Sequence, residues 1–153
     1  CPFCARFHEL VGKPLREEYV KTGKVRMIFR NFQFLGPESF LAAEAAECAK
    51  DQGKFWAYHD AIYREEARDG AEHNGNLNRS LFLRLAGDLG MDVAAFTDCF
   101  DGGKYREQVK EDTVAAQSAG VNSTPMTFVN GEELKGAVPY DQFKAVIDRI
   151  LSG

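Results

Sequence analysis

The sequence predicts an α/β fold in which a block of helices is inserted between the elements of one small sheet. Three observations predict it. A helical pattern opens the chain and leads into a run of branched and aromatic residues that is typical of a strand. The middle of the chain carries helical patterns only, and a hairpin signal followed by a final helix closes it. With 153 residues, 44% of them hydrophobic, the chain is long enough to bury a sizeable core.

Charge and hydropathy argue against a nucleic-acid partner and against a membrane-spanning helix in this chain. The formal net charge is -4, and basic residues alternate with acidic ones, so no surface for nucleic acid is predicted. No apolar run approaches the roughly 18 residues that a membrane-spanning helix needs. The chain opens on a cysteine rather than a start methionine, so we expect a fragment whose export signal or anchor would have been lost with the missing part.

The first predicted part covers residues 1–35. Apolar residues recur at three- and four-residue steps from Cys4 to about Tyr19, which predicts a helix, and Pro14 predicts a kink around Leu10 to Lys13. Gly23 ends this helix. The branched and aromatic run from Val25 to Phe32 then predicts a strand.

Residues 36–120 are predicted to be a helical insertion. Gly36-Pro37 marks the start of its first helix and Gly53 the stop, while a polar stretch rich in glycine and asparagine predicts a surface loop over residues 68–78. Helices are expected at about residues 38–52, 55–63, 79–89, 93–100 and 104–119.

Residues 121–153 return to strand patterns. Met126 to Val129 is predicted as a strand, Asn130-Gly131 as a tight hairpin turn, and Glu132 to Lys135 as the partner strand. Apolar residues from Tyr140 to Leu151 then predict a final amphipathic helix.

Cys1 and Cys4 form a Cys-x-x-Cys pair at the start of the first predicted helix. Unpaired N–H groups and the positive end of the helix dipole stabilise a thiolate there, and Pro2 suits the first helical position. Cys1 is therefore predicted to be the attacking sulfur. Cys4, one turn further in, would resolve a mixed disulfide with a substrate.

Other roles for this pair fit the sequence less well. A zinc site needs two more ligands at suitable spacing, and the remaining cysteines are isolated, so no metal is predicted. A structural disulfide that closes so short a loop restrains the unfolded chain very little. His8 is interpreted as an exposed helical residue, His59 as a packed or hydrogen-bonded one, and His73 as a solvated loop residue.

The Cys1-Pro2-Phe3-Cys4 motif, the helical insertion, Ser123-Thr124-Pro125 before a strand, and the Asn130-Gly131 hairpin together resemble a DsbA-like thioredoxin domain over nearly the whole chain. The resemblance implies a thioredoxin fold in which Pro125 is cis and lies beside the cysteine pair. Thr124 would present backbone groups to an extended substrate peptide. Pro2 and Phe3 would complete the substrate-binding surface.

The sequence departs from that family in two ways. Thioredoxin domains place a central strand before the cysteine pair, and we expect this strand to be missing from the chain as it stands. The dipeptide between the cysteines is Pro-Phe, where the best-known oxidases of the family carry Pro-His. Because a histidine there stabilises the thiolate further, this difference bears on the strength of oxidation.

The resemblance implies a thiol–disulfide oxidoreductase that works without a cofactor, outside the cytoplasm, in the periplasm or cell envelope. Its substrates would be reduced or partly unfolded proteins, and a membrane-bound redox partner would reoxidise it. Two alternatives stay open: a reductase of the same fold, and a non-catalytic module that binds an extended peptide at Thr124-Pro125.

Cys48 and Cys99 lie on the inward faces of two predicted helices. Two inert buried thiols would satisfy that pattern. A structural disulfide is favoured, because an exported oxidoreductase works where disulfides persist.

Overall fold

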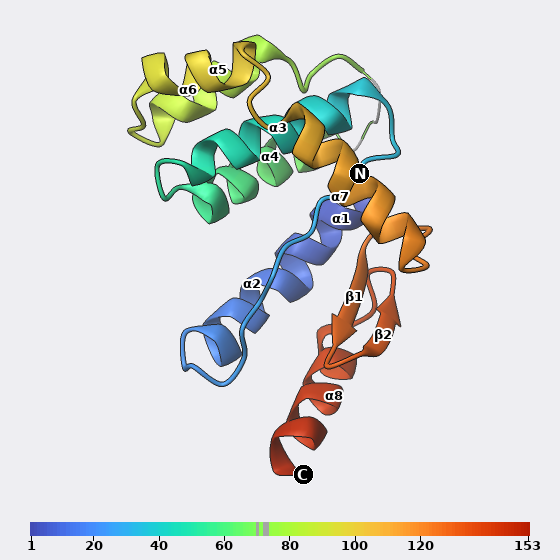
Figure 1. Cartoon of the computed structure of the whole chain (residues 1–153). Coiled ribbons are helices and arrows are strands. Elements are labelled where there is room, and N and C mark those ends of the chain that lie inside the picture. The colour runs from blue at the N-terminus through green and yellow to red at the C-terminus, as the bar shows by residue number, and fades with distance from the viewer. Residues whose placement is uncertain (70, 72–73) are drawn as a thin grey trace. The chain divides into compact units, whose positions relative to one another are not determined.

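The fold is described from a computed structural model that covers residues 1–69, 71 and 74–153. The chain divides into two compact units (Figure 1). Unit 1 consists of Cys1–Phe29 and Val121–Gly153, and unit 2 consists of Arg30–Gly120. Unit 2 is therefore an insertion into unit 1, and the sequence had placed the start of this insertion at residue 36.

Unit 1 opens with a helical run of four parts, α1 (Pro2–Phe7), η1 (His8–Gly12), α2 (Lys13–Leu15) and η2 (Arg16–Val20). The two η segments are π-helical, so the predicted interruption around Leu10 to Lys13 takes the form of a wider turn. In that turn the N–H of Lys13 donates to the carbonyl of His8, five residues back. A wider turn before Pro14 is consistent with a proline that has no N–H to donate.

The strand predicted from Val25 to Phe32 is wrong: among the described residues this segment is not part of a sheet. Its side chains nevertheless alternate as in a strand, with Val25 and Met27 half-buried against the core of unit 1 and Ile28 55% exposed. The sequence pattern therefore predicted the alternation of side chains correctly. A strand also needs a hydrogen-bonded neighbour, and no described segment supplies one.

The hairpin of unit 1 has the predicted bounds. Strand β1 (Met126–Val129) pairs antiparallel with β2 (Glu132–Lys135), and Met126 lies opposite Lys135. At the turn, Asn130 and Gly131 have φ angles of 48° and 91°, the left-handed region in which asparagine and glycine are favoured.

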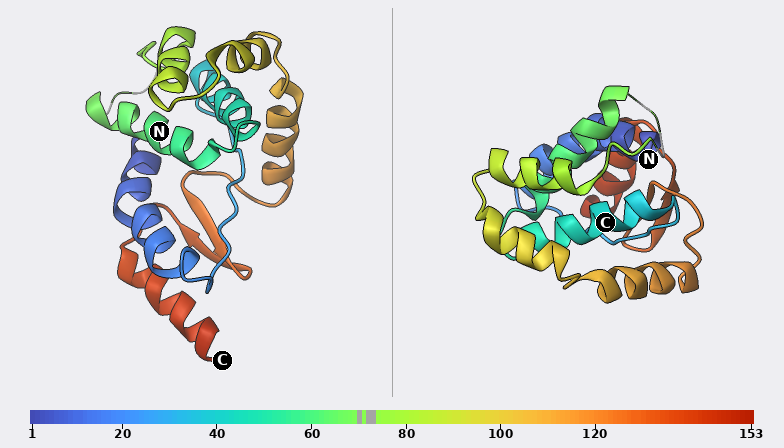
Figure 2. Two further views of the ribbon diagram at one scale, coloured as in Figure 1. Left: turned by 90° about the vertical axis from the view of Figure 1, so that its left-hand side faces the viewer. Right: turned by 90° about the horizontal axis from the view of Figure 1, so that it is seen from above.

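Helix α8 (Tyr140–Ser152) completes unit 1 and shares a core with the first helical run (Figure 2). Phe143 and Ile147 on α8 are buried, and the ring of Phe143 meets that of Phe7 edge to face at 5.6 Å. The buried members of this core are Val11, Leu15, Tyr19, Phe143 and Ile147.

The regular structure described in unit 2 is helical. Its helices are α3 (Pro37–Lys50), α4 (Phe55–Asp69), α5 (Arg79–Asp88), α6 (Val93–Asp101) and α7 (Arg106–Ser118). Each expected helix is present, but α4 runs to residue 69, so the predicted loop begins later than residue 68. His73 lies outside the described residues.

Aromatic and small side chains form the core of unit 2. Tyr58, Phe82 and Phe96 are fully buried, and Tyr58 donates a hydrogen bond to the carbonyl of Phe82 at 2.9 Å. Burial raises the pKa of this phenol well above its ordinary range, so Tyr58 stays a neutral donor.

A buried polar cluster holds the first residues of unit 2 against α3 and α7. The Nδ2 of Asn31, a residue only 2% exposed, donates to Glu47 Oε1 at 2.9 Å and to Asp112 Oδ2 at 3.1 Å. Two residues on, the N–H of Gln33 donates to the hydroxyl of Thr113 at 3.1 Å. One amide group therefore links two carboxylates from different helices.

Candidate active site

The cysteine pair lies at the start of α1, as the sequence predicted. Cys1 is the N-cap residue of this helix and Pro2 is its first residue. Both residues are in the thiol form; Cys1 is partly exposed, and Cys4 is 8% exposed. The more exposed cysteine therefore precedes the helix, and the buried one lies in its first turn.

Hydrogen bonds converge on the sulfur of Cys1. The backbone N–H of Cys4 donates to it at 3.4 Å, and the thiol of Cys4 donates to it at 2.7 Å. The hydroxyl of Thr124 lies 3.4 Å from the same sulfur. All three groups would donate to a Cys1 thiolate, and donors to the charged form favour that form.

The loop before β1 brings Thr124 to the cysteine pair. The Thr124–Pro125 peptide bond is cis, as the family resemblance implied for Pro125. The carbonyl of Pro125 accepts a hydrogen bond from the N–H of Gly136 at 2.8 Å, which ties the loop to the far end of the hairpin. Sequence reasoning assigned Thr124 a backbone role only, so the position of its hydroxyl is new.

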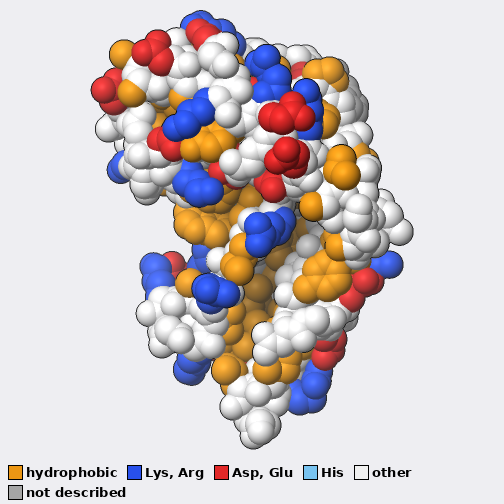
Figure 3. All heavy atoms as spheres, in the orientation of Figure 1, with side chains coloured by type: hydrophobic (Ala, Val, Ile, Leu, Met, Phe, Trp, Pro, Cys, Tyr) orange, Lys and Arg blue, Asp and Glu red, His pale blue; other side chains and the backbone are white. Residues whose placement is uncertain are grey.

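The predicted substrate-binding residues around the pair differ in exposure. Phe3 is 65% exposed, the largest exposed fraction among the exposed large hydrophobic residues, and Pro2 is partly exposed. Figure 3 shows hydrophobic side chains gathered on one face of unit 1. An apolar side chain in solvent is available to contact another protein.

The described histidines are not placed alike. His8 was interpreted as exposed, but it is 5% exposed, so that interpretation is wrong. The residue follows Cys4 by one helical turn, and its N–H donates to the carbonyl of Cys4, so it shares the buried side of the helix. His59 is packed and hydrogen-bonded as expected: its Nδ1 lies 3.0 Å from Asp60 Oδ1, and its ring meets that of Tyr63.

A polar cluster joins the far end of the first helical run to α8. Tyr19 donates to Asp148 Oδ1 at 2.5 Å, while Tyr140 and Lys144 both donate to Glu18. The Lys144 hydrogen bond, followed by that of Tyr140, lowers the pKa of Glu18. The Tyr19 hydroxyl lowers the pKa of Asp148.

The pKa of the Tyr140 phenol shifts in the opposite direction from those of the two carboxyl groups. Burial, with its hydrogen bond to Glu18, raises its pKa to about 12. This cluster packs the helical run that begins next to Cys1 against α8. The sequence contains no local indication of the cluster.

The remaining two cysteines are joined in a disulfide in unit 2. Cys48 on α3 and Cys99 on α6 have Cα atoms 5.9 Å apart and are separated by 51 residues. The sequence favoured a disulfide between these residues over two buried thiols, and the structure contains that disulfide.

Known proteins match nearly the whole chain. A family model described as "Thioredoxin" matches residues 1–149. A probable disulfide bond formation protein D of Bacillus anthracis is 32% identical over 155 residues, which cover 99% of this chain and 69% of that protein. The disulfide bond formation protein D of Bacillus subtilis is 26% identical over 160 residues, with 100% and 69% covered.

Solved structures agree with these relatives. The crystal structure of oxidised BdbD from Bacillus subtilis superposes with a TM-score of 0.88 at 26% identity and covers 100% of this chain and 83% of that chain. No helix among the described residues is both long and apolar enough to cross a membrane.

Proposed function

Because the chain belongs to the thioredoxin family, within which it is a thiol–disulfide oxidoreductase similar to the disulfide bond formation proteins, we propose that it oxidises protein thiols through Cys1 and Cys4. In the oxidised form these two residues would carry the disulfide that is passed on. The observation that carries the proposal is the convergence of donors on the Cys1 sulfur.

The direction of electron flow follows from which form the site stabilises. Donors from Cys4 and Thr124 favour the Cys1 thiolate, and this thiolate exists only after the disulfide has been given away. Stabilising the reduced form makes a disulfide a stronger oxidant. The arrangement therefore favours release of the disulfide to a substrate.

The reaction proceeds by two exchanges. A substrate thiolate attacks the exposed sulfur of Cys1, forming a mixed disulfide, and the electron pair of the broken bond leaves on Cys4. A second substrate thiolate then attacks the substrate's own sulfur, and Cys1 leaves as a thiolate held by its three donors. The substrate has lost two electrons, and the cysteine pair has gained them.

The substrates would be reduced or partly unfolded proteins. Exposed Phe3, two residues after Cys1, would provide apolar contact for chains that have not yet buried their own side chains. The Thr124–Pro125 loop would hold the segment next to the substrate cysteine, and Pro2 would border it.

The chain would work outside the cytoplasm, in the periplasm or cell envelope. The half-buried Cys48–Cys99 disulfide supports this location, because structural disulfides persist in oxidising compartments. After each turnover a membrane-bound redox partner would remove two electrons from the reduced pair.

The test uses oxidised protein and a reduced, unfolded substrate such as ribonuclease. Wild type should form substrate disulfides, whereas Cys1→Ser and Cys4→Ser have no disulfide to give and should form none. Offered a substrate that already carries a disulfide, reduced Cys4→Ser should accumulate a mixed disulfide on Cys1, and Cys1→Ser should not. A non-catalytic peptide-binding module would show no turnover in any variant.

A second measurement separates oxidase from reductase. The reduction potential of the Cys1–Cys4 couple, read by mass spectrometry after equilibration with glutathione, should lie nearer the value of about -120 mV known for DsbA than that of about -270 mV for thioredoxin. A value at the thioredoxin end would overturn the proposed direction.

A further inference from the structure

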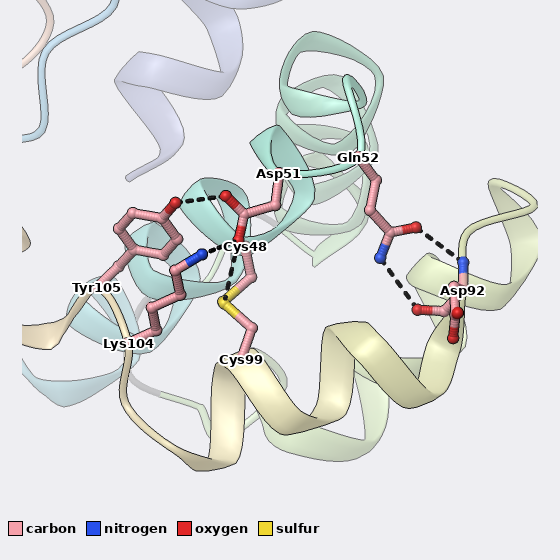
Figure 4. Close-up of a disulfide and its surroundings, with 7 residues drawn as sticks. All are labelled: Cys48, Asp51, Gln52, Asp92, Cys99, Lys104 and Tyr105. Carbon is pink, nitrogen blue, oxygen red and sulfur yellow. Dashed lines mark hydrogen bonds and ion pairs between the residues drawn. A yellow bond between two sulfur atoms is a disulfide. The ribbon is translucent and has the colours of Figure 1, made fainter.

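The two residues of the Cys48–Cys99 disulfide differ in exposure. Cys48 is 1% exposed inside the core of unit 2, whereas Cys99 is partly exposed at the end of α6 (Figure 4). Cys99 is therefore the cysteine of this pair that a thiolate from solvent can approach. Attack there would have to leave the electron pair on a sulfur in an apolar core, which is costly.

A carboxylate lies beside the exposed sulfur. Oδ2 of Asp51, the C-cap residue of α3, is 3.9 Å from Sγ of Cys99. The same oxygen accepts from Lys104 Nζ at 2.7 Å, and the other oxygen accepts from the hydroxyl of Tyr105 at 2.5 Å (Figure 4). These hydrogen bonds, that of Lys104 first, lower the pKa of Asp51, so the carboxylate stays charged.

Backbone contacts fix this arrangement. The N–H of Lys104 donates to the carbonyl of Cys99 at 3.1 Å, so the turn that carries Lys104 and Tyr105 is tied to the end of α6. At the other end of α6, the side-chain amide of Gln52 exchanges two hydrogen bonds with the backbone of Asp92, at 3.0 and 2.8 Å. Asp51 is therefore held in place next to the sulfur.

We propose that Asp51, positioned by Lys104 and Tyr105, shields the Cys48–Cys99 disulfide from attack by anionic thiols. The chain would thereby keep this disulfide out of exchange while the cysteine pair of unit 1 turns over. The shield concerns unit 2 alone and does not depend on the function proposed for Cys1 and Cys4.

The reaction that Asp51 opposes is ordinary thiol–disulfide exchange. The thiolate forms a bond to Cys99 Sγ as the Cys48–Cys99 bond breaks, and Cys48 leaves as a thiolate that takes a proton from solvent. A second thiol then releases Cys99, so the protein gains two electrons and the reagent becomes a disulfide. Negative charge spreads over the sulfurs in the transition state, and a carboxylate about 4 Å away raises its energy.

The two charged partners should act with opposite signs. Asp51→Asn leaves Lys104 as an uncompensated cation, and the rate of reduction of Cys48–Cys99 by glutathione should rise about threefold to tenfold at low salt. Lys104→Gln leaves the carboxylate uncompensated, and the same rate should fall. The rates are read on the whole 153-residue chain in its oxidised form by quenching with an alkylating agent and mapping peptides, with the Cys1–Cys4 pair as an internal reference.

Three controls make the result specific. Asp88→Asn removes another exposed carboxylate with a cationic partner, Arg84 at 3.4 Å, and should leave the rate unchanged. Cysteamine, whose ammonium group offsets the thiolate charge, should respond less to Asp51→Asn than glutathione does. Salt near 1 M should reduce both effects.

Asp51→Asn and Lys104→Gln could instead raise the rate of reduction of Cys48–Cys99 equally, with either thiol and at any salt concentration. Both changes would then act only by loosening the helix ends. That outcome would overturn the shield. An unchanged rate in both variants would overturn it as well.

Discussion

The sulfur of Cys1 lies 3.4 Å from the hydroxyl oxygen of Thr124, although 123 positions separate the two residues. The contact joins the first turn of α1 to the loop that precedes β1. Thr124 thereby offers Cys1 a donor from outside the Cys-x-x-Cys motif.

Replacing Thr124 by valine should make the Cys1 thiolate less stable, because the side chain keeps its shape and loses its donor. The midpoint of the curve of Cys1 alkylation rate against pH should move to higher pH, and the reduction potential of the pair should become more negative. Thr124→Ser, which keeps a hydroxyl, should stay close to wild type. Equal curves for the valine and serine variants would contradict this role.

Cys1 should be alkylated at least about tenfold faster than Cys4 in the reduced native protein near neutral pH. Cys1 is partly exposed and lies at a helix N-terminus, whereas Cys4 is 8% exposed. Iodoacetamide labelling followed by peptide mass spectrometry measures both rates, and labelling in urea, where the difference should vanish, is the control. Equal native rates would show that the two roles are assigned wrongly.

Asn31→Ala should lower the free energy of unfolding by about 1–3 kcal/mol, since it leaves the carboxylates of Glu47 and Asp112 without their shared donor. Asn31→Asp should cost more, because it adds a third carboxylate to the cluster. Gln33→Ala on the same segment is the matched control: it keeps the backbone hydrogen bond to Thr113 and should cost less. Urea unfolding measures all three, and a loss in Asn31→Ala no larger than in Gln33→Ala would refute the bridging role.

The cluster between the first helical run and α8 should make stability depend on pH at both ends of the scale. The pKa values of Glu18 and Asp148 are lowered in the folded state, so their contribution is present above the ordinary carboxylate range and is lost as pH falls through the lowered values. The pKa of Tyr140 is raised to about 12, so its contribution is present below the ordinary tyrosine value of about 10 and is lost as pH rises through the raised one.

Asp148→Asn tests the acidic limb. The difference in unfolding free energy between wild type and this variant, measured in urea, should shrink as the pH is lowered below the ordinary aspartate range. In a Tyr19→Phe background the pH dependence should be weaker, because the Tyr19 hydroxyl is the largest cause of the lowered pKa. A difference that stays constant with pH would show that the pair does not contribute through its charge.

Sequence reasoning succeeded where structure is set by neighbours in the chain. The turn at Asn130 and Gly131 and the cap formed by Cys1 both depend on residues within one turn, and both lie where predicted. The strand expected at Val25 to Phe32 failed for the opposite reason. The alternation of buried and exposed side chains in this segment is local and is present in the structure. A strand also needs hydrogen bonds to a second strand, and the sequence pattern of one segment does not identify that partner.

The candidate site shows the same division. The cysteine motif could be recognised from the sequence alone, and the cis bond before Pro125 followed from the family resemblance. The hydroxyl of Thr124 beside Cys1 and the carboxylate of Asp51 beside Cys99 join residues far apart in sequence, and no spacing rule connects them. His8 was expected in solvent, as is usual for a helical histidine, but its position one turn after Cys4 places it on the buried side of the helix.

Unit 2 is residues 30–120, and unit 1 is made of the two segments on either side of it. This division sets the order in which the parts of the redox site emerge during translation. Cys1 and Cys4 leave the ribosome before unit 2 with its own two cysteines, and Thr124 and Pro125 leave it after unit 2. Until residues 121–153 emerge, the Cys1 sulfur lacks the Thr124 hydroxyl. The nascent chain therefore holds all four cysteines before it holds its complete redox site, and correct pairing of Cys48 with Cys99 at that stage depends on unit 2 folding as an uninterrupted stretch of sequence.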